Sequence, residues 1–106
     1  MIARLWSARA TPAQVPAYLM HFSSQVAPAL RKFNGYAGHA VFTRNSPGSV
    51  EILVTTYWQS LEAIAAFAGP DREAAVVTTA AAALLLDYDR HARHYEVPRS
   101  DFPASS

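Results

Sequence analysis

Hydrophobic positions alternate along some segments of the chain and recur at helical spacing along others. Residues 2–9 alternate between two faces, which predicts a first strand with Ile2, Arg4, Trp6 and Ala8 on one side. A helix is expected next, because apolar residues then recur every three or four positions: Val15, Leu19, Phe22 and Val26. Thr11-Pro12 supplies its start, and Pro28 is expected to end or kink it, since proline has no amide hydrogen.

The middle of the chain has the pattern of a β-hairpin. Asn34-Gly35 is a turn signal before a strand over residues 36–44, and residues 50–58 form a further strand rich in β-branched and aromatic residues. The connecting turn over residues 45–48 contains Pro47-Gly48. Because this connection is so short, the two strands are expected to pair antiparallel.

The last third of the chain predicts helices followed by one strand. Ser60 is expected to cap a helix that carries Leu61, Ile64 and Phe67, and Gly69-Pro70 ends it. A short helical piece over residues 71–77 and a helix over residues 80–86 follow. Residues 90–97 are expected to form the last strand, and residues 98–106 a flexible tail.

This order of elements, β-α-β-β-α-β, predicts an α+β, ferredoxin-like fold with a four-stranded antiparallel sheet and both helices on one face. The opposite face should alternate with charged residues if water covers it. It is apolar instead, with Leu53, Thr55 and Tyr57 on the third strand. A monomer would expose this patch. We therefore expect a homodimer in which a second copy covers the sheet face.

Composition and charge narrow the class of protein. The 106 residues, 51% of them apolar, suffice for one domain, and the lack of cysteine excludes disulfides and thiolate chemistry. The net charge of +1 is made of interspersed signs, so no nucleic-acid partner is expected. No apolar stretch approaches the roughly 20 residues of a membrane helix, and the N-terminus does not resemble a signal peptide. The sequence thus predicts a cytoplasmic domain without a membrane partner.

Several short motifs, taken together and in order, resemble a known family. They are MIARLW at residues 1–6, YWQSLEAI at 57–64, FAG at 67–69, residues 71–77, and HYEV at 94–97. In this arrangement the chain is similar to the antibiotic biosynthesis monooxygenase (ABM) type of small protein, in the dimeric α+β barrel superfamily. The resemblance implies one ABM-like domain over residues 1–97 and a dimeric barrel. Because the superfamily hosts several unrelated activities, the fold alone does not fix the reaction.

The resemblance also implies a chemistry. Oxygenases of this type use neither metal nor flavin, so no cofactor is expected. They bind a small electron-rich aromatic substrate, such as a quinol or a polyketide phenol, and let its deprotonated form react with dioxygen. That reaction needs a base, a donor for the developing anion and an aromatic cavity that excludes water. The expected activity is a cofactor-independent monooxygenase.

Five side chains are the candidates for this site. His94 is expected to be the catalytic base, because an ordinary histidine pKa of about 6.5 suits proton abstraction near neutrality. In the ferredoxin order the last strand pairs with the first, which brings His94 near Trp6. Trp6 and Trp58 are expected to line the cavity, and His39 and Tyr57 to contact the substrate. His39 has a second possible place, at the dimer interface.

Other polar residues have weaker claims to a role. His21 and His91 are expected to be exposed, and His91 and His94 lie three apart on a strand, so they face opposite sides and predict no metal site. Arg4 and Arg44 are both candidates to hold a substrate anion.

The sequence departs from the family pattern in two places. Oxygenase members often place an amide side chain in the cavity, whereas Asn34 and Asn45 fall in turns. The haem-degrading branch has an iron-ligating histidine in its second helical region, and no histidine lies between Gln59 and Asp89. Haem degradation is therefore not expected. Two alternatives to an enzyme stay open: a dimer that binds a small hydrophobic molecule without altering it, and a structural protein.

Overall fold

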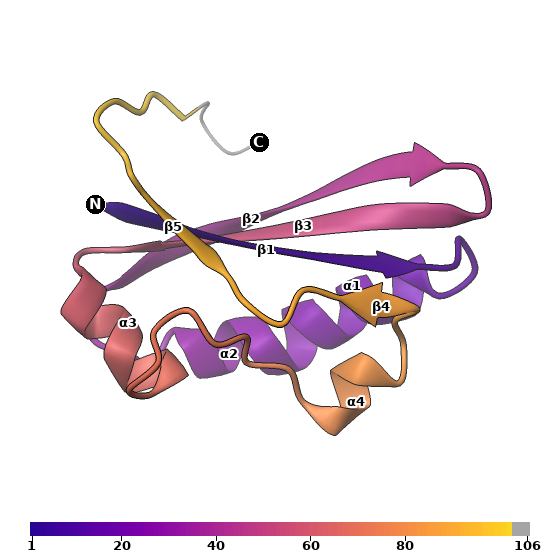
Figure 1. The fold of residues 1–106 in the computed structure, drawn as a ribbon, viewed down its shortest axis with the longest axis horizontal. Helices are drawn as coiled ribbons and strands as arrows, with labels where there is room; N and C mark the ends of the chain where they lie inside the picture. Colours follow the sequence, from indigo (N-terminus) through magenta and orange to yellow (C-terminus); the bar gives the residue numbers. More distant parts are fainter. Residues whose placement is uncertain (103–106) are drawn as a thin grey trace.

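The computed structural model describes residues 1–102 and contains a sheet with helices packed on one side of it (Figure 1). The elements in chain order are β1 (Ile2–Ala10), α1 (Val15–His21), the π-helical turn η1 (Phe22–Val26), α2 (Ala27–Leu30), β2 (Tyr36–Ser46), β3 (Ser49–Trp58), α3 (Leu61–Ala68), α4 (Thr79–Ala82), β4 (Asp87–Tyr88) and β5 (Arg93–Glu96). Among the described residues, no helix is long and apolar enough to cross a membrane.

β1 is the centre of an antiparallel sheet in the order β2-β3-β1, with β4 and β5 both pairing on the other edge of β1. β5 pairs with residues Ile2 to Leu5, and β4 pairs with Ala8 and Arg9. The α+β, ferredoxin-like fold predicted from the sequence is thus confirmed. The expected fourth strand over residues 90–97 is shorter than predicted, and β4 was not predicted, so this edge of the sheet is made of two strands.

The core lies between the sheet and the helices. Four side chains in it have almost no exposed surface: Trp58, Leu30, Ile52 and Ile64. Gly35 lets the start of β2 approach α3 closely, because a Cβ atom there would lie 2.6 Å from the Cβ of Ala63. Its φ of +86° is also one that only glycine adopts readily. This contact draws α3 onto the sheet.

The first helical region continues past Pro28 as three consecutive helical segments. α1 passes into the π-helical turn η1, in which the amide of Ala27 donates to the carbonyl oxygen of Phe22, five residues earlier. Pro28 then occupies the first turn of α2, where a missing amide hydrogen costs little. The predicted end or kink at Pro28 thus takes the form of a widened turn just before it.

Residues 71–78 are not helical, which corrects the predicted helix over residues 71–77. A turn at Asp71 to Ala74 is followed by extended backbone up to Thr78. Tertiary partners take the backbone groups that a helix would use: Ala75 donates to the carbonyl oxygen of Arg90, and Ala92 donates to that of Glu73. α4 is likewise shorter than predicted, because Thr78 caps it and it ends at Ala82.

The C-terminal segment returns along the uncovered side of the sheet (Figure 1). The amide of Val97 donates to the carbonyl oxygen of Met1, and the ring of Phe102 lies 5.4 Å from that of Tyr57. Residues 103–106 of the predicted flexible tail lie outside the described residues, and the flexibility of the tail stays a prediction.

Candidate functional site

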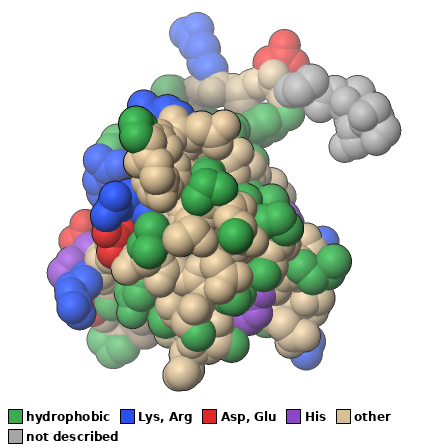
Figure 2. Space-filling model, turned by 90° about the vertical axis from the view of Figure 1, so that its right-hand side faces the viewer, with side chains coloured by type: hydrophobic (Ala, Val, Ile, Leu, Met, Phe, Trp, Pro, Cys, Tyr) green, Lys and Arg blue, Asp and Glu red, His purple; other side chains and the backbone are tan. Residues whose placement is uncertain are grey.

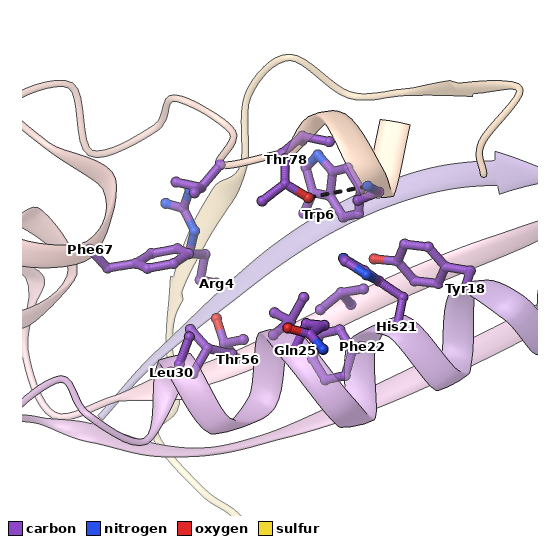
Figure 3. A pocket seen from close by; sticks show the side chains of 16 residues that line it. Arg4, Trp6, Tyr18, His21, Phe22, Gln25, Leu30, Thr56, Phe67 and Thr78 are labelled. Carbon is purple, nitrogen blue, oxygen red and sulfur yellow. Dashed lines mark hydrogen bonds between the residues drawn. The ribbon is translucent and has the colours of Figure 1, made fainter. Parts of the chain in front are cut away.

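A cavity of about 210 Å³ lies between the helix-facing side of the sheet and the first helical region (Figure 3). β1 and β3 form its floor, the helices α1 to α2 one wall, and α3 with the segment before α4 the other wall. Its lining residues are Arg4, Trp6, Tyr18, His21, Phe22, Gln25, Val26, Ala29, Leu30, Val54, Thr56, Phe67, Val76, Val77, Thr78 and Ala81.

Arg4 is the charged residue of the cavity wall, although it lies on the central strand and is only 5% exposed. One Nη1 hydrogen is donated to the carbonyl oxygen of Arg72, and Nη2 donates to that of Ala74 over 2.7 Å. Nη1 also lies 2.8 Å from Nε2 of His94. The guanidinium carbon stands 5.6 Å from the centre of the Phe67 ring, within the range of a cation–π contact.

No carboxylate forms an ion pair with Arg4 within residues 1–102. The ion pairs in that part of the chain join Arg9 to Asp87 and Arg44 to Glu51. Burial lowers the pKa of Arg4, and the more distant charge of Asp71 partly offsets the effect. Carbonyl dipoles thus surround a buried cation whose charge no carboxylate neutralises at close range.

His94 holds Arg4 in place from the neighbouring strand. The two residues are paired directly between β1 and β5. Since a guanidinium can only donate, Nε2 of His94 accepts the hydrogen bond and this ring is neutral. Burial first, and the charge of Arg4 second, lower the pKa of His94, while Glu73 raises it and Arg72 lowers it further. His94, the predicted base, is not among the lining residues of the cavity, and its Nε2 faces Arg4.

His21 lines the cavity although the sequence pattern indicated an exposed residue. Its Nε2 is buried and has no hydrogen-bond partner among the described residues. The neighbouring Tyr18 ring lies 6.5 Å away, and burial raises the pKa of Tyr18 to about 12, so its hydroxyl stays protonated. A helical stripe offered a signal for this site, because Tyr18, Gln25 and Ala29 recur around His21 at spacings of three and four.

Gln25 brings an amide side chain to the cavity wall. It was not predicted, because only the asparagines were considered as sources of an amide. Gln25 comes from η1, and π-helical turns are frequent at functional sites because they displace side chains from the regular helical spacing. Phe22 and Val26 of the same turn also line the cavity.

The two tryptophans have different environments. Trp6 lines the cavity, and its indole N–H donates to the carbonyl oxygen of Asp89 over 2.7 Å. Trp58 is completely buried behind the wall and is not a lining residue. Its N–H donates to Oγ1 of Thr56 over 2.9 Å, so Trp58 supports a lining residue instead of reaching a substrate.

His39 and Tyr57 do not line the cavity either. A β-bulge between Tyr36 and Gly38 breaks the strand alternation and brings Tyr36 to the same side as His39, three residues later. The Tyr36 hydroxyl lies 2.5 Å from Nδ1 of His39, whose ring packs 4.9 Å from that of Phe22 on the helical side. Burial and the charge of Arg31 lower the pKa of His39. Tyr57 faces the uncovered side of the sheet, against Phe102.

Comparisons with known proteins show what this fold is similar to. No family model and no curated protein matches the sequence. Several solved structures match, and three of them do so over nearly their whole length. A proposed antibiotic biosynthesis monooxygenase from Bacillus cereus has a TM-score of 0.68 and 16% identity, covering 99% of this chain and 98% of its own. A second one, from Deinococcus radiodurans, has a TM-score of 0.60 and 17% identity, covering 99% and 100%.

The third is the haem degrader MhuD of Mycobacterium tuberculosis, described with two haems in its active site. It has a TM-score of 0.60 and 21% identity, covering 96% of this chain and 100% of its own. The chain therefore has the ferredoxin-like fold of ABM-like proteins, as its motifs indicated.

Haem does not fit the helix that corresponds to the family's second helical region. α3 has the sequence LEAIAAFA, which contains none of the histidine, cysteine, tyrosine or methionine ligands of haem iron. Within residues 1–102, no group of three or more potential ligands could hold a metal ion.

Proposed function

We propose that the protein is a cofactor-independent monooxygenase of a small phenol or quinol. The observation that carries the proposal is a buried guanidinium, Arg4, that has no carboxylate partner among residues 1–102 and lines an otherwise mainly apolar cavity. A cation in a low-dielectric cavity favours the anionic form of whatever binds there. The fold shared with proposed monooxygenases supports the reaction class.

The reaction begins with loss of the substrate hydroxyl proton. The resulting phenolate transfers an electron pair from its ring carbon to dioxygen, and a carbon–oxygen bond forms. The hydroperoxide then loses water as its oxygen–oxygen bond and the ring carbon–hydrogen bond break, which leaves a quinone. One phenol and one dioxygen thus give one quinone and one water. The positive charge of Arg4 favours the anionic form of the bound substrate, and the aromatic walls exclude water.

His21 is the base in this proposal, because its Nε2 is buried at the cavity wall without a partner. His94 positions Arg4 through the hydrogen bond between Nε2 and Nη1. The prediction from the sequence, in which His94 itself takes the proton, is the alternative assignment. His94→Gln separates the two, since glutamine accepts a hydrogen bond from Arg4 but cannot act as a base at neutral pH.

Oxygen uptake with a panel of naphthols and naphthohydroquinones tests the activity. Arg4→Gln is expected to lower turnover by roughly 100-fold, because the variant loses the charge that favours the anionic form of the bound substrate. Arg31→Gln is the matched control, because Arg31 is exposed, directly follows α2 and is not a lining residue of the cavity. Equal turnover in both variants would contradict the proposal, as would oxygen uptake no faster than without protein.

A non-catalytic binding protein of the same fold is the second candidate. This candidate is favoured because Nε2 of His94, the predicted base, already accepts a hydrogen bond from Arg4. Naphthol binding in the cavity without oxygen uptake would select this candidate.

The homodimer is part of the same proposal. The uncovered side of the sheet carries Phe42, which is 51% exposed, and Tyr95, which is 49% exposed. A shallow groove on that side is lined by Phe42, Thr43, Arg44, Glu51 and Leu53. A second copy would remove this apolar surface from water. The cytoplasmic location stays a prediction from the sequence.

A further inference from the structure

We infer that the cavity takes a hydroxylated aromatic acid, whose anionic group pairs with Arg4 and whose hydroxyl bonds to Nε2 of His21. This inference rests on the proposed function and names its substrate class. Two polar groups with unmet bonding capacity, in a cavity with mainly apolar walls, carry it.

Arg4 has donors left for a ligand. A guanidinium has five N–H donors, and the described residues take three of them, through Arg72, Ala74 and His94. Its charge also lacks a partner, because no carboxylate of residues 1–102 forms an ion pair with it. Burying an unpaired cation is costly, and a bound carboxylate would neutralise the charge and use the remaining donors. A neutral ligand would do neither.

His21 supplies the second point of recognition. Nε2 of His21 is the one buried side-chain nitrogen or oxygen atom of the described residues without a hydrogen-bond partner. Buried polar atoms of folded proteins nearly always have a partner, so an unmatched atom in a cavity wall indicates a group that arrives with a ligand. A hydroxyl fits either tautomer, because it both donates and accepts.

The positions of these two residues define the shape of the ligand. Figure 3 shows Arg4 beside Phe67, and His21 further along the helical wall beside Tyr18. Trp6, Leu30 and Val54 line the space with apolar surface. A flat molecule of one or two rings, with an acid at one end and a hydroxyl at the other, matches this arrangement and the volume of about 210 Å³.

Calorimetric titration with four probes tests the inference. They are 6-hydroxy-2-naphthoate, its methyl ester, 2-naphthoate, which lacks the hydroxyl, and 2-naphthol, which lacks the acid. For the wild-type protein we expect the hydroxy acid to bind roughly 10- to 100-fold more tightly than its ester, the range for hydrogen bonds to a charged group. Loss of the hydroxyl should weaken binding by about fivefold.

Variants assign each effect to its residue. Arg4→Gln should abolish the preference for the acid over the ester, and His21→Phe should abolish the effect of the hydroxyl while the preference for the acid persists. Arg31→Gln should leave both ratios unchanged, because Arg31 does not line the cavity. If Arg4→Gln fails to fold, the comparison of acid and ester on the wild-type protein still tests whether the cavity prefers an acid. Equal affinity for acid and ester would overturn the inference.

The inference and the proposed function fail in different ways. Tight binding of the hydroxy acid without oxygen uptake would contradict the monooxygenase and leave the ligand class standing. Oxygen uptake with uncharged naphthols and no affinity for the acid would contradict the ligand class and leave the monooxygenase standing.

Discussion

Arg4 shows how one side chain can serve both the fold and the site. It lies on the central strand, and its guanidinium binds the carbonyl oxygens of Arg72 and Ala74 in the segment that covers the cavity. The segment is thereby held over the sheet without helical hydrogen bonds of its own. Because the same guanidinium lines the cavity, a ligand bound to Arg4 would be coupled to the position of this segment.

The histidine beside Arg4 makes stability depend on pH. Burial and Arg4, helped by Arg72 and opposed by Glu73, keep the pKa of His94 below 6.5 in the folded protein. The unfolded chain therefore binds a proton at a pH where the folded chain does not. The contribution of His94 to the free energy of unfolding is therefore complete above the pKa that this residue has in the unfolded chain. It is lost as the pH falls through the lower pKa of the folded protein.

We expect the Tm of the wild-type protein to fall between about pH 7 and about pH 5, the range in which histidines take up protons. His39 contributes in the same direction, because its pKa is also lowered. In His94→Gln the fall should be smaller, since glutamine accepts the hydrogen bond from Arg4 and binds no proton. Thermal denaturation at a series of pH values measures the difference. Parallel curves for the two proteins would contradict the role given to His94.

Among the secondary-structure elements, β1 and the β2–β3 hairpin follow their sequence patterns closely. β1 places Ile2, Arg4, Trp6 and Ala8 on one face, as alternation predicts. The hairpin turn is built on Pro47 and Gly48, whose φ is +77°. These elements were predictable because local alternation and turn residues determine them.

The site was less predictable, because it depends on contacts distant in sequence. Nothing local marks Arg4 as buried, since its carbonyl partners lie 68 and 70 residues away. The β-bulge that places Tyr36 beside His39 has only Gly38 as a local sign. His21 was assigned to the surface because it lies beside the predicted apolar stripe through Phe22 and Val26. The cavity also uses this adjacent side of the helix.

The contact between β2 and α3 predicts a difference between two glycine substitutions. Gly35→Ala combines a positive φ with a Cβ contact of 2.6 Å to Ala63, whereas Gly48→Ala, at φ +77°, meets nothing within 4 Å. The positive φ costs each variant about 1–2 kcal/mol. The crowding should cost Gly35→Ala a further 1–3 kcal/mol, about the usual cost of overpacking. Urea denaturation measures both values, and equal losses would show that the contact with α3 is not tight.

For the molecule as a whole, the two sides of the sheet differ in what covers them. All the described helices lie on one side, and the other carries only the C-terminal segment (Figure 1). Seen from the hairpin end, charged side chains lie mainly at the margins of the view, most of them on the left, while apolar side chains are scattered over its centre among uncharged polar atoms (Figure 2). Exposure of the aromatic and aliphatic side chains of the open side to water is unfavourable.

The open side contains two rows of residues paired across three strands. One row joins Leu5, Thr55 and Ala40, and the next joins Ser7, Leu53 and Phe42. Thr55 is only 4% exposed within a single chain, whereas Phe42 is 51% exposed. The large apolar side chain of these rows is thus most exposed on β2, where a second copy related by a two-fold rotation would cover it with the same surface.

We therefore expect the wild-type protein to sediment as a dimer at micromolar concentration and Phe42→Asp to sediment as a monomer, because the variant buries an unpaired carboxylate at the interface. Met20→Asp is the matched control, since Met20 is 68% exposed and belongs to α1, on the helical side. It should remain a dimer. A monomeric wild-type protein would contradict the dimer. A dimeric Phe42→Asp variant would show that the interface does not lie on the open side of the sheet. Because Arg4 and His21 both lie on the helical side, naphthoate binding should persist in the Phe42→Asp monomer.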